Sequence, residues 1–259
     1  MNEFLEGRCW QRPPISIARA LQATPLQLMK ALIFDTFGTV VDWRTSLIED
    51  CTRFGNQRGL HVDWVGLVDD WRAEYKPSMD RVRTGKEPWR TLDQLHRASL
   101  EQLVTNRNIQ GLTSGDLDYL VTGWHRLRPW PDAVPGLSRL RSKFIVGPLS
   151  NGNVALLVNL AKFAGLPWDV VFGTDLWQHY KPDSETYLGA CRLLGLDPPE
   201  VMMVAAHNYD LHAASQLGLR TAFIPRPAEY GPNQSTDLKP EGSWDIVATD
   251  IVDLARQLA

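Results

Sequence analysis

The sequence has few cysteines, no long apolar run and no excess of basic charge. Its three cysteines, Cys9, Cys51 and Cys191, form neither a disulfide framework nor a zinc-ligand pattern, so a reducing, cytoplasmic location is expected. No apolar stretch approaches the roughly 20 residues that span a bilayer, which predicts no membrane association. The net charge of −3 and the absence of basic runs interleaved with aromatic residues argue against nucleic-acid binding.

What remains is an ordinary globular composition. Hydrophobic residues make up 44% of the chain and charged residues 22%. A length of 259 residues suffices for one large domain, or for a core with an inserted module. There are no internal repeats or low-complexity tracts.

Residues 1–29 are predicted to be an N-terminal extension outside the catalytic core. They mix arginines with Glu3 and Glu6 and lack the continuous apolar region of a signal peptide. Met29 stands directly before the first predicted strand and would itself be a plausible start. A docked helix from Ile17 to Met29 is the alternative.

The first predicted strand ends on an aspartate. The apolar run from Lys30 to Phe34 leads into Asp35, and Gly38 and Thr39 follow in a turn. Carboxylates at the carboxyl end of a buried strand lie where open α/β sheets bind ligands. A glycine in that turn lets backbone N–H groups approach a substrate closely. Asp35 is therefore the leading candidate for a catalytic group.

The rest of the chain divides into a helical block and an alternating segment. Residues 44–130 show helical spacing, with helices expected over 45–59 and 63–79 and from residues 91 and 114. Residues 131–259 alternate helix and strand, which predicts an α/β fold with a doubly wound parallel sheet. The strand in residues 30–43 must join this sheet across the helical block. Six of the ten tryptophans lie from Trp43 to Trp130, either as ordinary core or as an apolar lid.

The turn D-x-F-G-T that begins at Asp35 resembles the first motif of the haloacid dehalogenase superfamily, whose nucleophile is that aspartate. Phosphatases of the superfamily carry a second aspartate two residues later, where this chain has Phe37. An aromatic ring cannot protonate a leaving alkoxide, so Phe37 favours the dehalogenase branch. Residues 30–259 resemble the L-2-haloacid dehalogenases.

This resemblance implies a Rossmann-like core from residues 30–43 and 131–259, with residues 44–130 as a helical cap. It also implies a small 2-haloalkanoate substrate, no metal and no other cofactor. Homodimers are common in the family, although no residue pattern in this chain demonstrates one.

Three further strand-end segments resemble the remaining superfamily motifs. Ser150 and Asn151 match the second motif, where a hydroxyl and N–H groups at a helix N-terminus hold an anion. Lys181, fixed by the proline that follows, matches the third and is expected to keep Asp35 ionised. Asp210 matches the fourth motif. Taken singly, each of these residues is as consistent with a cap, a turn or a solvated charge.

The fourth motif departs from the family pattern. Serine and asparagine are common five and three residues before the aspartate, but Ala205 and His207 stand there. His207 is expected to replace a hydrogen-bonding or halide-facing group, or else to be an ordinary strand-end histidine. Asn208 is expected to turn towards the substrate.

Two residues outside the core motifs also match the family. Arg72 resembles the arginine that stabilises the leaving halide, a task suited to a permanently charged guanidinium, with Arg81 and Arg83 as nearby rivals. Tyr187 is expected to bind substrate or the active-site carboxylates, or merely to pack against its helix.

The mechanism implied is attack by Asp35 on the halogen-bearing carbon, followed by hydrolysis of the resulting ester with Asp210 as base. The expected supporting roles are halide binding by Arg72 and Asn151 beside Phe37, and substrate-carboxylate binding by Ser150 and backbone N–H groups from Thr36 onward, with Thr39 structural near the site. A magnesium-dependent phosphatase and a non-enzymatic binding module are the alternatives.

Overall fold

A parallel sheet forms the centre of the computed structural model, which describes residues 29–259. Its six strands lie in the order β5-β4-β1-β6-β7-β8. Their bounds are β1 (Ala31–Phe34), β4 (Ile145–Ser150), β5 (Phe172–Gly173), β6 (Val201–Ala205), β7 (Arg220–Phe223) and β8 (Ile246–Val247). Every residue of β1 is buried, as expected for a parallel sheet covered on both faces.

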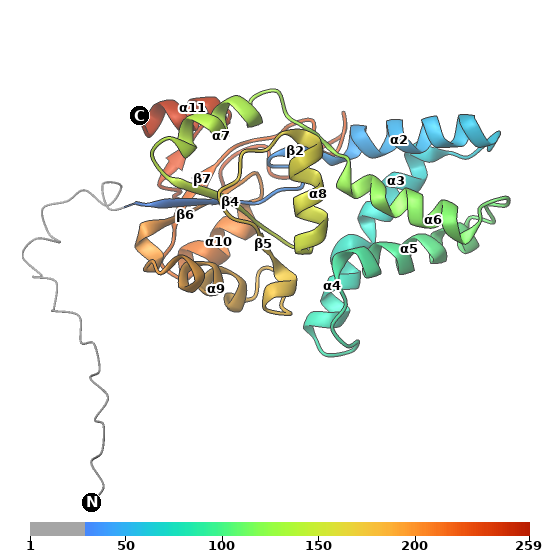
Figure 1. The fold of residues 1–259 in the computed structure, drawn as a ribbon, viewed down its shortest axis with the longest axis horizontal. Coiled ribbons are helices and arrows are strands. Elements are labelled where there is room, and N and C mark those ends of the chain that lie inside the picture. The colour runs from blue at the N-terminus through green and yellow to red at the C-terminus, as the bar shows by residue number, and fades with distance from the viewer. Residues whose placement is uncertain (1–28) are drawn as a thin grey trace, which may run out of the picture.

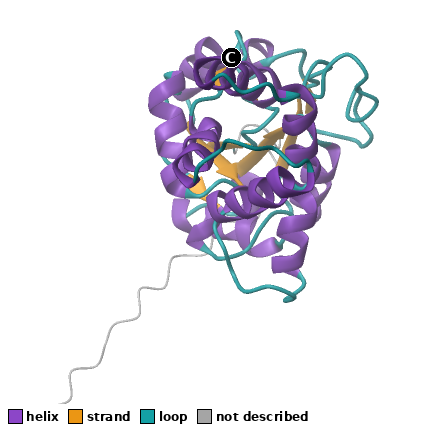
Figure 2. Cartoon of the chain, turned by 90° about the vertical axis from the view of Figure 1, so that its right-hand side faces the viewer, coloured by secondary structure: helices purple, strands orange, loops and turns teal. Residues whose placement is uncertain are grey.

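Helices cover both faces of this sheet. They are α7 (Ala133–Arg141), α8 (Val154–Ala164), α9 (Ser184–Leu194), α10 (Asn208–Gln216) and α11 (Ile251–Gln257), with the short η3 (Thr174–Leu176) and η4 (Pro198–Glu200). Figure 1 shows α7 and α11 on one face and α9 and α10 on the other, and Figure 2 shows the strands enclosed between helices. Alternate residues of β1 accordingly belong to two hydrophobic clusters, Leu32 and Phe34 to one, Ala31 and Ile33 to the other. The predicted doubly wound α/β fold is confirmed.

The helical block projects from the sheet at the right of Figure 1. It comprises α2 (Trp43–Arg58), α3 (Trp64–Ala73), α4 (Tyr75–Arg83), α5 (Leu92–Asn106), α6 (Ser114–Val121) and the short η2 (Thr122–His125). The chain enters it through β2 (Val41–Asp42) and leaves it through β3 (Arg128–Pro129), which pair antiparallel. Because these two strands lie side by side, the block is a continuous insertion after β1.

The sequence placed several helix boundaries differently. Helix α2 begins at Trp43 rather than at residue 45, and Asp42 caps it, since its Oδ1 accepts the Thr45 N–H at 3.0 Å. The single helix expected over 63–79 is two helices that meet at Glu74. Pro77 has no N–H to donate to the carbonyl of Ala73, which explains the interruption.

Two short elements of the alternating segment shape the site. Strand β5 consists only of Phe172–Gly173. Helix α10 begins at Asn208, which places Asp210 in its first turn. The predicted N-terminal extension lies outside the described residues except for Met29, which is buried directly before β1.

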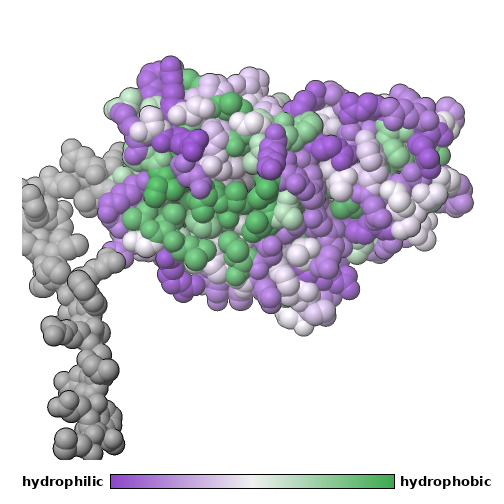
Figure 3. All heavy atoms as spheres, viewed as in Figure 1, coloured by the Kyte–Doolittle hydropathy of each residue, from purple (hydrophilic) through white to green (hydrophobic). Residues whose placement is uncertain are grey.

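The surface differs between the two parts. In the view of Figure 3, apolar residues gather on one face of the core, whereas the end formed by the helical block is mainly hydrophilic. Within residues 29–259, no helix combines the length and apolarity needed to cross a bilayer.

The strand order decides where the candidate residues meet. Strand β1 lies between β4 and β6 and runs parallel to both. The carboxyl ends of all three strands therefore face the same edge of the sheet, and they lead directly to Asp35, Asn151 and His207.

Candidate active site

A buried lysine joins two carboxylates at this edge. Lys181 Nζ lies 2.9 Å from Asp35 Oδ1 and 2.5 Å from Asp210 Oδ2. Burial alone would raise the pKa of Asp35, but the Lys181 ammonium and His207 hold it well below its usual range. Burial raises the pKa of Asp210 despite the same lysine. Asp35 is therefore held in its ionised form.

Neighbouring side chains fix this group. Thr39 Oγ1 donates to Asp35 Oδ2 at 2.7 Å and accepts the Ala206 N–H at 2.9 Å, which ties the β1 turn to the end of β6. Asn151 Oδ1 accepts the backbone N–H of Lys181 at 2.8 Å. The elements that carry the three charged groups are thus cross-linked by hydrogen bonds.

Of the alternatives predicted for Tyr187, its contacts correspond to hydrogen bonding with an active-site carboxylate. Its hydroxyl donates to Asp210 Oδ1 at 2.5 Å, and the side chain is fully buried. Both oxygens of Asp210 thus accept a hydrogen bond, one from Tyr187 and one from Lys181. Tyr187 contacts an active-site carboxylate rather than the cavity.

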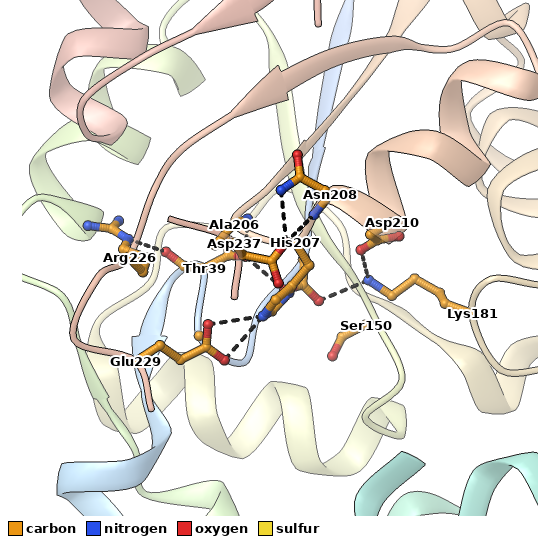
Figure 4. Close-up of polar contacts among 12 residues, drawn as sticks. Thr39, Ser150, Lys181, Ala206, His207, Asn208, Asp210, Arg226, Glu229 and Asp237 are labelled. Carbon is orange, nitrogen blue, oxygen red and sulfur yellow. Dashed lines mark hydrogen bonds and ion pairs between the residues drawn. The ribbon is translucent and has the colours of Figure 1, made fainter. Parts of the chain in front are cut away.

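His207 lies between two carboxylates. Its Nδ1 is 3.1 Å from Asp35 Oδ2, and its Nε2 is 3.0 Å from Glu229 Oε2. Burial would lower the pKa of His207, but the charge of Glu229 and hydrogen bonds to both carboxylates raise it well above its ordinary value. Figure 4 shows Glu229 reaching His207 from one side, with Lys181 and Asp210 at the other side of the site. His207 is therefore an imidazolium that donates from both nitrogens.

Glu229 is the residue that sequence reasoning missed. It lies in the loop after β7, is only 1% exposed, and also accepts the Trp43 Nε1–H at 3.0 Å. Gly38 makes room for it: a Cβ at Gly38 would lie 2.1 Å from Glu229 Oε1, and Gly38 has a φ of +87°. A lone glutamate in a loop matches no local pattern, so the sequence held no signal for it.

The cap supplies a mostly buried cation, Arg72, whose side chain is 12% exposed. Its guanidinium stacks over the Tyr75 ring at 4.1 Å and the Trp43 ring at 5.0 Å, and its Nη2 lies 3.8 Å from Glu229 Oε1. Its Nη1 is buried and has no hydrogen-bond partner among the described residues. Nearby acidic and tyrosine side chains hold the pKa of Arg72 above its usual range against the effect of burial, so the charge is permanent.

Both rival arginines form ion pairs, although Arg83 also lines the cavity that Arg72 lines. Arg81 pairs with Glu87 at 2.7 Å, and Arg83 pairs with Asp183 at 2.7 Å. Of these three arginines, Arg72 has the most buried side chain.

A cavity of about 680 Å³ lies between cap and core. It is lined on the core side by Asn151, Lys181, His207, Tyr209 and Tyr230 and on the cap side chiefly by Trp43, Arg72, Tyr75 and Met79. Two of these groups, Lys181 and His207, bond Asp35 directly, so the cavity leads to that carboxylate.

Phe37 and the cap tryptophans form the packing around this cavity. The Phe37 ring is buried and packs edge-on against Tyr75 and Trp124 instead of lining the cavity. Trp71 and Trp124 are fully buried in the core of the cap. Trp43 has both of the roles predicted for these tryptophans, because it is buried in the core and also lines the cavity as part of its apolar wall.

Asn208 is not brought to the site. Its Nδ2 donates to Asp237 Oδ1 at 2.9 Å, and its Oδ1 accepts from the Glu241 N–H at 2.9 Å and from Trp244 Nε1 at 3.1 Å. The side chain therefore holds the 237–244 loop. The substrate-binding role expected for Asn208 conflicts with this placement, because its amide is already engaged.

Two residues expected to bind substrate lie close to Asp35 and are buried. Ser150 ends β4, and its Oγ accepts the Gly152 N–H at 3.2 Å. Thr36 follows Asp35, and its Oγ1 is buried without a hydrogen-bond partner among residues 29–259. In the same described residues, no three His, Cys, Asp or Glu side chains are arranged to hold a metal ion.

Comparison with known proteins agrees with this geometry. The family model described as haloacid dehalogenase-like hydrolase matches residues 29–218. The curated (S)-2-haloacid dehalogenase 4A of Burkholderia cepacia is 28% identical over 211 residues, which cover 78% of this chain and 87% of that protein.

Two solved structures are more similar. The L-2-haloacid dehalogenase PA0810 is 54% identical, with a TM-score of 0.86 over 89% of this chain and 100% of that one. The defluorinating L-2-haloacid dehalogenase Rha0230 is 52% identical, with a TM-score of 0.87 over 89% of this chain and 95% of that one.

A doubly wound core, an inserted helical cap and an aspartate bridged to a lysine at the end of β1 define a hydrolase of the haloacid dehalogenase-like class. Within that class the chain belongs to the L-2-haloacid dehalogenase family. The family membership predicted from the sequence motifs is confirmed.

Proposed function

We propose that the chain converts a short 2-haloalkanoate and water into the 2-hydroxy acid and halide, through an ester on Asp35. The observation that carries this proposal is the pairing of two groups across one cavity. The core supplies a buried, ionised carboxylate, and the cap supplies the guanidinium of Arg72, whose buried Nη1 has no hydrogen-bond partner within residues 29–259. One group suits displacement of a halide, and the other suits its stabilisation.

The first half-reaction is an in-line attack on the carbon that bears the halogen. Asp35 Oδ1 accepts one hydrogen bond, from Lys181, whereas Oδ2 accepts from both Thr39 and His207. Oδ1 is therefore the freer oxygen and the attacking atom. The carbon–halogen bond breaks with its electron pair, halide departs towards Arg72 and Asn151, and the configuration at carbon inverts.

The substrate carboxylate is assigned to Ser150 and to backbone N–H groups from Thr36 onward. Because Ser150 Oγ already accepts the Gly152 N–H, its own hydroxyl proton is available for donation to an anion. Placing the carboxylate there orients the halogen towards the cap, where Arg72 lies.

The second half-reaction is hydrolysis of the ester. Water attacks Cγ of Asp35, and its proton passes to Asp210, whose raised pKa suits a base. Lys181 holds both carboxyl groups in place. The bond between Cγ and the alkyl oxygen breaks, the departing alkoxide takes the proton, and Asp35 is regenerated with release of one proton to solvent.

Chloroacetate and a generic phosphate ester, each with and without EDTA, test the proposal. Halide release that persists in EDTA supports a dehalogenase, whereas EDTA-sensitive phosphate release identifies a phosphatase. No release from either substrate leaves a binding module. Asp35→Asn is the matched control and should abolish steady turnover, provided that mass spectrometry shows no deamidation back to aspartate.

The covalent route has its own test. With enzyme in excess, one turnover in H₂¹⁸O should place ¹⁸O in the Asp35 carboxylate and leave the first product unlabelled. Direct displacement by water, with Asp35 acting only as a base, gives labelled product and an unlabelled peptide. Mass spectrometry of the peptide that contains Asp35 distinguishes the two routes.

A further inference from the structure

The position of His207 gives it a task in the second half-reaction. Once Asp35 Oδ1 carries the alkyl group, Oδ2 is the carbonyl oxygen of the ester. Two donors already face this atom, Thr39 Oγ1 at 2.7 Å and His207 Nδ1 at 3.1 Å. When water adds to Cγ, the π-electron pair moves onto Oδ2, where the negative charge collects.

We infer that His207 is a cationic hydrogen-bond donor to Oδ2 of the Asp35 ester and, with Thr39, forms the oxyanion site for its hydrolysis. This inference rests on the dehalogenase function proposed above. Donors aimed at the atom where charge develops, in a site closed to water, are among the strongest contributors to catalysis. His207 and Thr39 are 4% and 0% exposed, so both donors act in such a site.

Glu229 keeps this donor charged. Both of its oxygens lie within 3.1 Å of His207 Nε2, and it is itself buried. Formation of the ester removes the negative charge of Asp35, which is one of the two charges that stabilise the imidazolium. Glu229 then remains as the counter-charge, and without it the histidine would tend to lose its proton when the oxyanion needs it.

Other charged groups leave this assignment in place. Tyr209 stacks on the His207 ring at 5.9 Å, Arg72 Nη2 lies 3.8 Å from Glu229 Oε1, and Lys181 reaches Asp35 through Oδ1 rather than Oδ2. None of them lies between His207 and Oδ2. Asp210 is fully buried and hydrogen-bonded to Tyr187 and Lys181, so its role as base does not compete with His207 as donor.

Single-turnover kinetics with chloroacetate test the inference, because they separate the two half-reactions. Halide release reports attack by Asp35, and the mass of the peptide containing Asp35 reports the ester. In His207→Gln, halide release should remain within a few-fold of wild type, while ester hydrolysis slows on the order of 10²–10³-fold. The ester should then accumulate. Unchanged hydrolysis, or an equal loss in both steps, overturns the inference.

Glu229→Gln provides a second variant of nearly the same shape, which guards against failure of His207→Gln to fold. Because the acid form of His207 is the active one, wild-type ester hydrolysis should slow as pH rises through its pKa. Removing the Glu229 charge lowers that pKa, so the fall should move to lower pH. Hydrolysis that instead accelerates with pH, through a group shifted by Glu229→Gln, would identify His207 as a general base and overturn the donor role.

His212→Gln is the matched control. His212 lies on α10, the helix that begins directly after His207, is exposed, and packs edge-on against Trp244 instead of contacting the site. Both half-reactions should be unchanged in this variant. If wild-type enzyme releases no halide, the proposed function fails together with this inference. If it releases halide and His207→Gln hydrolyses the ester normally, only the inference fails.

Discussion

The buried His96 in the cap should make the stability of this protein fall in mild acid. It is fully enclosed by aromatic rings, stacking on Trp124 at 4.1 Å beside Trp71 and Tyr75. Neither ring nitrogen has a hydrogen-bond partner among residues 29–259. Burial lowers the pKa of His96 from the ordinary 6.5 to about 3. The charge of Asp93 opposes this decrease, and the charge of Arg72 adds a smaller decrease.

The direction and the magnitude of this effect on the free energy of unfolding follow from the linkage between proton binding and folding. Between pH 3 and 6.5 the unfolded chain binds a proton at His96 and the folded chain does not, so acidification stabilises the unfolded state. One pKa unit corresponds to about 1.4 kcal/mol. Between about pH 8 and about pH 5, His96 should therefore cost about 2 kcal/mol of the free energy of unfolding.

Urea unfolding of wild type and His96→Phe over this pH range measures the effect. Phenylalanine keeps a flat ring in the stack and cannot bind a proton, so the free energy of unfolding of the variant should depend less on pH. A constant offset between the two proteins reports packing alone. The contribution of His207, whose raised pKa has the opposite sign, is present in both proteins and cancels. Parallel curves, with the same change from about pH 8 to about pH 5, would refute the reasoning.

Three further predictions concern catalysis. Arg72→Ala should slow halide release on the order of 10²–10³-fold, because it removes the cation that receives the halide. Rapid-quench halide assays should show no such loss in Arg81→Ala, and the reverse result would place the leaving group elsewhere. Excess EDTA should leave halide release intact, because the Lys181 ammonium already bridges the two carboxylates that a divalent cation would share; a loss restored by Mg²⁺ contradicts this. Tyr187→Phe should slow ester hydrolysis about tenfold or more, since Asp210 loses a hydrogen bond worth about 1.5–3 kcal/mol. An unchanged rate in single-turnover assays would show that this hydrogen bond does not affect the reactivity of Asp210.

Local patterns in the sequence sufficed for the residues that end strands. Asp35 follows a four-residue apolar strand, and its place beside Lys181 and Asp210 follows from parallel strands sharing one edge. The orientation of Asn208 could not be predicted in this way. It depends on hydrogen bonds to the 237–244 loop, a segment without periodicity.

Tertiary placement explains the other differences. Glu229 contributes to the site only because the chain after β7 returns to the turn at Gly38, and no spacing in the sequence records that return. Tyr187 was recognised as a site residue, but its contact with Asp210 depends on how α9 packs against the sheet. Hydrophobic periodicity predicts helices and strands, and sequence motifs predict which residues end the strands. The direction of a side chain depends instead on neighbours that are distant in sequence.

The space at Gly38 has a consequence for protein engineering. The carboxylate of Glu229 occupies the position that a side chain on residue 38 would need, so Glu229 in this position is sterically incompatible with any residue other than glycine at position 38. Grafting the histidine and its counter-ion into a related scaffold is therefore a three-position exchange, in which residue 38 must be glycine before residues 207 and 229 are introduced. A two-position graft onto a turn that carries a side chain would displace the glutamate and leave an uncompensated histidine beside the nucleophile.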